Sequence, residues 1–204
     1  MEGDDDYRIW SQVPRHHVVS FAVIPSHGEE IFQYQENLEQ LFTALREDQE
    51  TPAGYALLDR DKPKPTPQQA PQQSILFVQL GCHEAENLYL SDNVLELLNT
   101  DWAHASAKLV AQAQKFPNKA ELLAAAQTWN RADGDFKNLI HEISAILDSK
   151  QVHWTIRVGQ AIGKARPTAQ LADFLGQEVV TALWGPATPL RRELIEFTAA
   201  MRCR

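Results

Sequence analysis

Acidic side chains are concentrated in two short stretches of the sequence, and each stretch lies beside an apolar run. The first stretch is Glu2-Gly3-Asp4-Asp5-Asp6, and the second is Asp59-Arg60-Asp61, which follows Tyr55-Ala56-Leu57-Leu58. Mg²⁺ prefers oxygen ligands and is usually held by a few carboxylates together with water and substrate phosphates. Carboxylates at the ends of neighbouring strands can converge on one ion, so the two stretches predict a divalent-metal site.

The spacing within each stretch suits a shared ligand role. Glu2 and Asp6 are four residues apart, so they would lie on one face of a helix that begins at about Asp4. Asp59 and Asp61 are two residues apart and would point the same way from an extended segment. Both pairs could therefore present two carboxylates to the same ion.

The segments around these acids are expected to alternate between strand and helix. Residues 17–25 form a β-branched and aromatic run closed by a proline, which is typical of a buried strand. Residues 29–46 carry apolar side chains at helical spacing, and residues 54–58 and 74–80 are expected to be further strands. A strand, a helix and a strand in this order form a right-handed βαβ unit, whose ligands collect at the carboxyl ends of the strands.

A third acidic stretch follows the strand expected at residues 74–80. It reads Gly81-Cys82-His83-Glu84-Ala85-Glu86-Asn87-Leu88-Tyr89. Taken with the first two stretches, it resembles the Toprim domain, and more narrowly the Toprim nucleases of the OLD (overcoming lysogenisation defect) family and related ATPase-associated defence effectors. Such domains carry a glutamate after the first strand, an acid four residues later, a D-x-D after the third strand and an R-E-x-E-N-Y segment. His83 stands in place of that arginine here, and Leu88-Tyr89 inverts the aromatic order.

The resemblance covers nearly the whole chain and implies an α/β fold. We expect a Toprim-like, Rossmann-type, mainly parallel sheet that is flanked by helices and carries a helical insertion. In this scheme residues 1–90 form the Toprim core, residues 91–150 form the helical insertion, and residues 151–204 complete the core.

The resemblance also implies a two-metal site that uses Mg²⁺ or Mn²⁺. Asp59 would belong to the first ion and Asp61 to the second. The further metal or water ligand is Glu84 or Glu86, with Glu86 preferred, and the catalytic acids are Glu2 and Asp59. The acids that would hold the two ions are Glu2, Asp6, Asp59, Asp61, Glu84 and Glu86.

OLD-type nucleases have a late Gly-Lys pair near the position of Gly163-Lys164. The resemblance implies that Lys164 stabilises the transition state. A lysine beside the scissile phosphate neutralises charge that develops on phosphorus. Lys164 follows a run at residues 151–158 that we expect to be a strand, and a helix is expected at residues 171–184. Arg157, Lys164 and Arg166 are the predicted nucleic-acid contacts. Spacing alone is almost equally compatible with Lys164 as an ordinary surface lysine.

Charge is distributed unevenly along the chain, whose formal net charge is −8. Residues 1–61 carry 4 Lys and Arg against 13 Asp and Glu, whereas residues 151–204 carry 7 against 4. Nucleic-acid binding usually shows as a basic surface, but here the negative charge is concentrated where metal ions would neutralise it. An acidic protein with an ordinary solvated surface is an equally good interpretation of the charge alone.

Composition restricts the class of protein. The 204 residues are 44% hydrophobic, which suits one globular domain or one domain with an insertion. No apolar run approaches the roughly 18 residues that span a bilayer, and Cys82 and Cys203 are too few for a disulfide framework or a zinc site. We expect a cytoplasmic protein, with a loop rich in proline and glutamine at residues 62–73.

These observations predict a metal-dependent nuclease that hydrolyses phosphodiester bonds in DNA or RNA. The resemblance implies that it acts as an effector with an ABC-type ATPase in anti-phage defence. The chain has no Walker motif, so the ATPase would be a separate subunit or an upstream domain. Only Met1 precedes Glu2, so the first strand would also come from an upstream part or from another polypeptide.

Two further possibilities stay open at this point. A homo-oligomer is compatible with the sequence. The alternative function is a catalytically silent Toprim subunit that assembles with or regulates an ATPase complex, which the short first strand and the altered segment at His83 favour.

Overall fold

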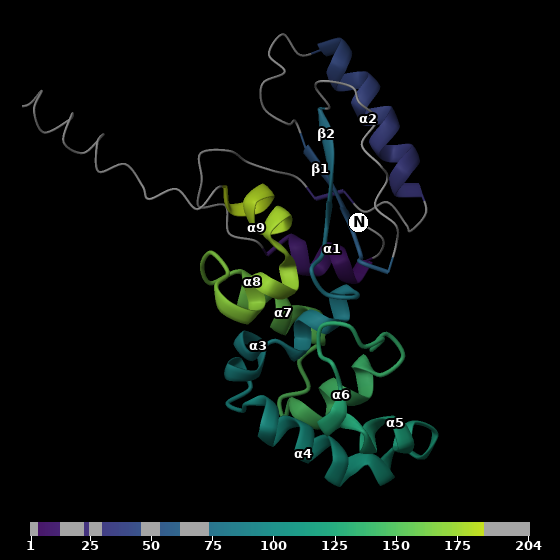
Figure 1. The fold of residues 1–204 in the computed structure, drawn as a ribbon, viewed down its shortest axis with the longest axis vertical. Coiled ribbons are helices and arrows are strands. Elements are labelled where there is room, and N and C mark those ends of the chain that lie inside the picture. Colours follow the sequence, from purple (N-terminus) through teal and green to yellow (C-terminus); the bar gives the residue numbers. More distant parts are fainter. Residues whose placement is uncertain (1–3, 13–22, 25–29, 46–53, 62–73, 186–204) are drawn as a thin grey trace, which may run out of the picture.

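The structure is a computed structural model that describes residues 4–12, 23–24, 30–45, 54–61 and 74–185 (Figure 1). Most of the described residues are helical, and two strands among them form a small parallel sheet. In chain order the elements are α1 (Asp4–Trp10), α2 (Ile31–Leu45), β1 (Gly54–Leu58), β2 (Ile75–Gln79), the 3₁₀ helix η2 (Ala85–Leu90), α3 (Asp92–Leu97), α4 (Trp102–Gln112), η3 (Ala113–Lys115), η4 (Pro117–Lys119), α5 (Ala120–Ala124), η5 (Ala126–Thr128), α6 (Ile140–Leu147), α7 (Trp154–Ile162), α8 (Ala169–Leu175) and α9 (Gln177–Trp184).

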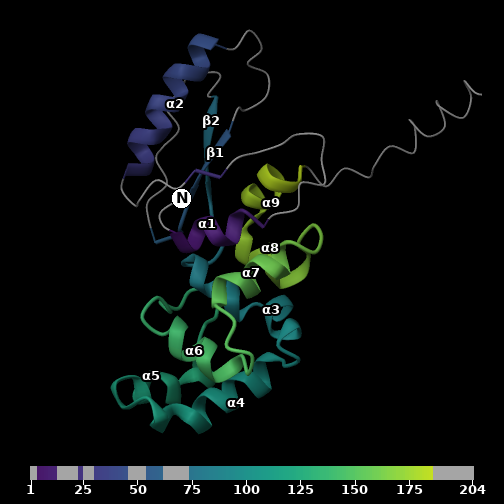
Figure 2. The ribbon, with the colours of Figure 1, turned by 180° about the vertical axis from the view of Figure 1, so that it is seen from behind.

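Strands β1 and β2 are parallel and are covered by helices on both faces. Leu58, at the end of β1, pairs with Gln79 at the end of β2. Because side chains alternate along a strand, Ala56 and Leu58 belong to a small cluster beneath α2. Leu57 and Val78 point the other way and join the main core. Figures 1 and 2 show α2 and α9 on opposite sides of the strands. Helix α2 and strands β1 and β2 confirm the helix predicted at 29–46 and the strands predicted at 54–58 and 74–80.

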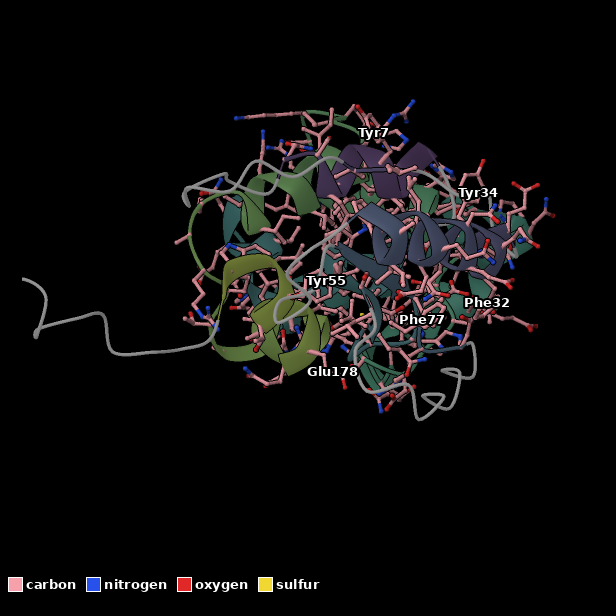
Figure 3. All side chains as sticks on the ribbon, turned by 90° about the horizontal axis from the view of Figure 1, so that it is seen from above. Tyr7, Phe32, Tyr34, Tyr55, Phe77 and Glu178 are labelled. Atoms are coloured by element: carbon pink, nitrogen blue, oxygen red, sulfur yellow. The ribbon has the colours of Figure 1, made fainter. Side chains whose placement is uncertain are left out.

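Helix α2 is attached to β2 by both apolar and polar contacts. The rings of Phe32 and Phe77 lie with their centroids 5.6 Å apart (Figure 3). The Glu39 carboxylate accepts hydrogen bonds from the amides of Ser74 and Ile75, each at 2.7 Å. The first amides of β2 therefore find their partner on a helix, which fixes where the strand begins.

The main hydrophobic core is continuous from α1 to α9. One cluster of buried side chains contains residues of α1, both strands, η2 and every helix from α3 to α9. Trp10 of α1 and Trp154 of α7 are among its largest fully buried members. The predicted division of the chain at residues 90 and 150 stays a prediction, while the core itself continues across both positions.

Helix α7 corrects the strand that we expected at residues 151–158. The apolar residues of this segment alternate, which favours a strand, but they also fit a helical period. Trp154, Val158 and Ile162 are buried at spacings of four residues, while Ile156 is 39% exposed. That pattern is the buried stripe of a helix, and α7 packs it against α1 and α3.

The helix expected at residues 171–184 is divided into α8 and α9 by Gly176. Gly176 has a φ of +83°, which a residue with a Cβ rarely adopts. The break lets Gly81, just after β2, approach the α8–α9 junction, where its amide donates to the Leu175 carbonyl at 3.2 Å. This contact joins the end of the sheet to the C-terminal helices.

Some expectations lie outside the described residues. The strand expected at 17–25 falls there except for residues 23 and 24, and the loop expected at 62–73 falls there entirely. Among the described residues, no helix has the length and apolar character that a membrane crossing requires.

Gly81→Ala is expected to lower the free energy of unfolding by about 2 kcal/mol, because the added Cβ would overlap the Asp173 carbonyl oxygen and force the backbone to shift. Urea denaturation measures this change. Gly54→Ala is the matched control, since its Cβ would meet only the flexible end of the Ile75 side chain at 3.1 Å. Equal stabilities of the two variants would contradict the close approach at Gly81.

Candidate functional site

The loops that follow β1 and β2 lie side by side at the carboxyl edge of the sheet. The Leu80 amide donates a hydrogen bond to the Leu58 carbonyl at 3.0 Å. The amides of Arg60 and Asp61 both donate to the His83 carbonyl, at 2.9 and 3.3 Å. The D-x-D segment and the third acidic stretch are therefore joined through their backbones, as expected for ligands at the ends of parallel strands.

Five of the predicted metal ligands come to this edge from three parts of the chain. Asp6 lies in α1, Asp59 and Asp61 follow β1, and Glu84 and Glu86 follow β2. The negative charges of Glu84 and Asp6 act on Glu86, and that of Asp61 acts on Glu84. We call this group of carboxylates the acidic edge. Within the part of the chain that the structure describes, no three His, Cys, Asp or Glu side chains lie close enough together to hold a metal ion.

Burial and like charge act together on two of these acids. Burial raises the pKa of Glu86 to about 7, and the charges of Glu84 and Asp6 add to the rise, while a backbone hydrogen bond and Lys137 oppose it. Burial also raises the pKa of Glu84, which is 5% exposed. The Oε2 atom of Glu84 has no hydrogen-bond partner among the described residues. Two such carboxylates are costly to ionise together, and either a proton or a cation relieves that cost.

Buried Asn87 joins residues 130–137, which we call the 130–137 loop, to the acidic edge. Asn87 donates from Nδ2 to the carbonyls of Arg131 and Gly134, at 2.8 and 2.9 Å. Its Oδ1 accepts the Glu84 amide at 3.0 Å. The helical region after residue 91 therefore contributes directly to the candidate site.

The 130–137 loop brings charged side chains that the sequence analysis did not select. Lys137 Nζ lies 3.9 Å from Glu84 Oε1. Asp133 forms an ion pair with Arg60, the central residue of the D-x-D segment. The only sequence feature that marks this loop is its turn-forming composition of asparagine, aspartate and glycine. Such a composition indicates a turn and does not indicate what the turn contacts.

The structure describes Asp4, Asp5 and Asp6 but not Glu2. Helix α1 covers Asp4–Trp10 and contains Asp6. Glu2 itself lies outside the described residues, so its ligand role stays a prediction. Asp5 forms an exposed ion pair with Arg8 at 3.2 Å, so its carboxylate already has a partner within α1.

Two of the three predicted nucleic-acid contacts are engaged within the fold. Arg157 is buried, and its Nε donates to Asp148 at 2.7 Å. Arg166 donates to the carbonyls of Trp184 and Gly185 at the end of α9, at 3.1 and 2.5 Å. Both guanidinium groups hold helices in place, so we no longer propose them as phosphate ligands.

Lys164 is exposed but lies at the far end of α1 from the acidic edge. Its neighbour Gly163 packs against the carbonyl of Gln12, just beyond the end of α1. Asp6 lies in the first turn of the same helix. Gln12 is six positions after Asp6, which corresponds to about 9 Å at the rise of a helix. The structure thus does not bring Lys164 beside the acids as we expected.

Cys82 is a buried free thiol next to the acidic edge. Burial and the negative charge of Asp59 raise its pKa, so the unreactive thiol form is favoured. Its Sγ contacts the Glu84 carbonyl at 3.2 Å. Cys82 therefore helps to pack the segment that carries Glu84.

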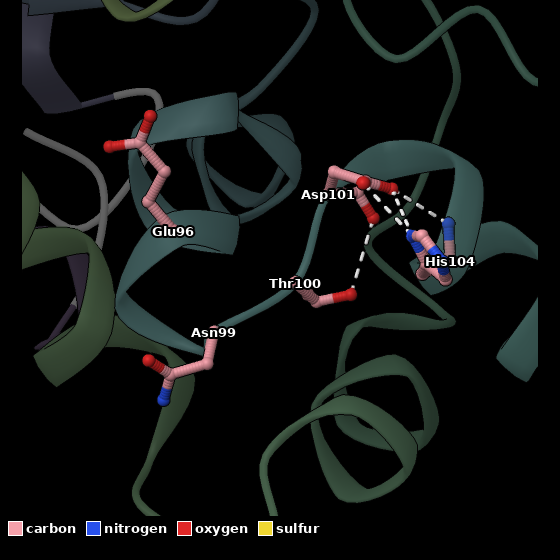
Figure 4. A pocket seen from close by; sticks show the side chains of 5 residues that line it. All are labelled: Glu96, Asn99, Thr100, Asp101 and His104. Atoms are coloured by element: carbon pink, nitrogen blue, oxygen red, sulfur yellow. Dashed lines mark hydrogen bonds and ion pairs between the residues drawn. The ribbon is translucent and has the colours of Figure 1, made fainter.

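A surface hollow at the α3–α4 junction is a separate feature. Its lining residues are Glu96, Asn99, Thr100, Asp101 and His104 (Figure 4). Asp101 is the N-cap of α4 and accepts hydrogen bonds from the amide and ring of His104, at 2.8 and 2.9 Å. These bonds lower the pKa of Asp101. The pairing is that of a helix cap and is explained by the local structure alone.

Comparison with protein-family models, with curated proteins and with solved structures found no significant match to this chain.

The raised pKa of Glu86 predicts that stability falls as pH rises. The ordinary pKa of a glutamate is near 4.5, so between about pH 4.5 and 7 the folded protein keeps a proton that the unfolded chain has lost. Stability that is present below pH 4.5 is therefore lost as pH approaches 7. Glu86→Gln should be about 2–3 kcal/mol more stable than the wild type at pH 8, and about equally stable near pH 4.

Urea denaturation at a series of pH values measures this difference. Glu121→Gln, at an exposed position of α5, is the control and should follow the wild-type curve. A Glu86→Gln variant whose stability changes with pH as the wild type does would show that Glu86 titrates normally.

Proposed function

We propose that this chain is a metal-dependent nuclease of the Toprim type that hydrolyses phosphodiester bonds. One observation supports this proposal above the others. Carboxylates from α1, from the end of β1 and from the end of β2 come to one edge of a parallel sheet, where a buried oxygen of Glu84 lacks a hydrogen-bond partner among the described residues. Acids in this arrangement are suited to bind a cation.

The donor chemistry fits Mg²⁺ or Mn²⁺. Both are hard cations that prefer carboxylate oxygens, and a cation would offset the burial and the like charge that together raise the pKa of Glu86. The residues that would hold it are Asp6, Asp59, Asp61, Glu84 and Glu86, together with Glu2. If two such ions were bound there, they would supply Lewis-acid activation of water and stabilisation of the leaving oxygen in phosphodiester hydrolysis.

The fold supports the same proposal at the level of architecture. Parallel strands with helices on both faces bind ligands at their carboxyl ends, and the acidic edge lies at that end of β1 and β2. A Toprim-like, Rossmann-type sheet with a helical insertion is the finer fold that we propose.

The wider role rests on the resemblance in the sequence. We propose a cytoplasmic effector that cuts DNA or RNA together with an ABC-type ATPase subunit or an upstream ATPase domain, in defence against phage.

Asp59→Asn is expected to reduce Mg²⁺-dependent cleavage of plasmid DNA or tRNA at least about 100-fold, because loss of a ligand charge removes several kcal/mol of transition-state stabilisation. Gel assays of cleavage with Mg²⁺, with Mn²⁺ and with EDTA measure this effect. Glu121→Gln should cleave at the wild-type rate, and EDTA should stop cleavage by both proteins. Full activity of Asp59→Asn would show that Asp59 is not a metal ligand.

A catalytically silent Toprim subunit that assembles with or regulates an ATPase complex is the second candidate. It is favoured by the absence, within the described residues, of any three side chains close enough to hold a metal. Titration with Mn²⁺, followed by electron paramagnetic resonance, separates the two candidates. A nuclease should bind Mn²⁺ at the acidic edge and lose that binding in Glu84→Gln, whereas a silent subunit should bind it weakly and cut nothing.

A further inference from the structure

We infer that helix α2 closes the outer edge of β2, because its Gln35 and Glu39 side chains take the hydrogen-bonding places that a further strand would occupy. The outer edge is the side of β2 that faces away from β1. An open strand edge pairs readily with other chains, so a contact that closes it decides what the sheet can bind. The closed edge is independent of the proposed nuclease function.

The pairing of the two strands shows which backbone groups of β2 face outward. The Ser74 carbonyl accepts the Gly54 amide at 3.2 Å, and the Leu80 amide donates to the Leu58 carbonyl at 3.0 Å. The amide and carbonyl of one residue point to the same side of a strand, and those of the next residue point to the other side. The odd-numbered residues from 75 to 81 therefore direct these groups away from β1.

Ile75 has both of its outward groups bonded to α2. Its amide donates to Glu39 Oε2 at 2.7 Å, and its carbonyl accepts the Gln35 side-chain amide at 3.1 Å. The Ser74 amide, just before the strand, donates to Glu39 Oε1 at 2.7 Å. A neighbouring strand would likewise offer one acceptor and one donor to such a residue. The two side chains of α2 thus reproduce the contacts of a strand.

Helical spacing and packing hold these two side chains in place. Gln35 and Glu39 are four residues apart, so they lie on one face of α2. Ile75 is 4% exposed and belongs to the small cluster beneath this helix. The rings of Phe32 and Phe77 add a second contact between the same two elements (Figure 3). An incoming strand could pair with Ile75 only by displacing Gln35 and Glu39.

The far end of the same edge lies against the α8–α9 junction. The Gly81 amide donates to the Leu175 carbonyl at 3.2 Å. A Cβ placed on Gly176 would lie 3.2 Å from the Gln79 carbonyl oxygen, so the junction also covers that residue. Residue 77 lies between the two closures. A strand usually has at least about three residues, so this interval is too short for strand pairing.

Closure of this edge restricts how the protein can assemble. A second copy of the chain cannot extend the sheet from β2 while Glu39 occupies the start of the edge. The carboxylate also repels the carbonyl oxygens that an incoming strand would bring. The strand that we expect from an upstream part or from another polypeptide would have to join the sheet elsewhere.

The test compares Glu39→Ala with the wild type over a range of protein concentrations. Loss of both acceptor oxygens should make the amides of Ser74 and Ile75 exchange with D₂O at least about tenfold faster at low concentration. Sedimentation velocity should show self-association at least about tenfold tighter than that of the wild type, because the outward groups of residues 75 and 77 can then pair with another copy. Glu39→Gln should lie between the two, since its amide offers one acceptor oxygen in place of two.

Two control variants separate edge closure from a general loss of stability. Glu36→Ala, at an exposed position of the same helix, should behave as the wild type. Leu38→Ala removes an apolar contact between α2 and the small cluster, so it should lower the melting temperature. Below that temperature it should associate no more tightly than the wild type, because Glu39 is still in place.

Three results would overturn the inference. Wild-type exchange of the Ser74 and Ile75 amides in Glu39→Ala would show that Glu39 does not protect them. Faster exchange without tighter association would show that the edge is not closed by Glu39. Equal association of Leu38→Ala and Glu39→Ala would attribute the effect to lost stability.

Discussion

The buried carboxamide of Asn87 is the interaction on which the acidic edge depends. Its Oδ1 accepts the Glu84 amide while its Nδ2 donates to two carbonyls of the 130–137 loop. One side chain thereby fixes the segment that carries the candidate ligands and also a loop that lies more than forty residues away in the sequence. An amide is suited to this place because it offers two donors and an acceptor at once. A carboxylate would repel both carbonyls, and an apolar side chain would take this partner away from three backbone groups at once.

The acids around Asn87 are held in an electrostatically unfavourable arrangement. Glu84 and Glu86 are withdrawn from water and lie near further negative charges, so the pKa of each is raised. The rest of the fold compensates, because the segment from Leu80 to Leu90 is buried in the main core and bonded to both neighbouring loops. Proteins tolerate such local cost chiefly where a ligand or a reaction relieves it.

Short apolar runs and one helical spacing were predictable from the sequence, whereas a segment that fits two periods was not. The apolar runs at 54–58 and 74–80 predicted strands and the spacing at 29–46 predicted a helix, and all three are confirmed. Residues 152–158 fit both an alternating and a helical pattern, and packing against α1 decided for the helix α7. The last helical run is divided at Gly176, where Gly81 approaches closely, and the helical pattern of residues 171–184 does not encode that contact.

The sequence by itself determined which acids could take part in the candidate site, because each stands directly after a predicted strand or in the helix that precedes the sheet. Parallel strands bring such positions to the same edge, so chain order was enough to bring Asp59, Asp61, Glu84 and Glu86 together. Only the tertiary structure decided which cation accompanies them. The Gly-Lys pair marked Lys164 in the sequence, but the hydrogen bonds of Asn87 hold the loop of Lys137 at the acidic edge, whereas the packing of α7 on α1 places Lys164 elsewhere. Contacts between residues distant along the chain set these positions, and residue type and spacing do not carry that information.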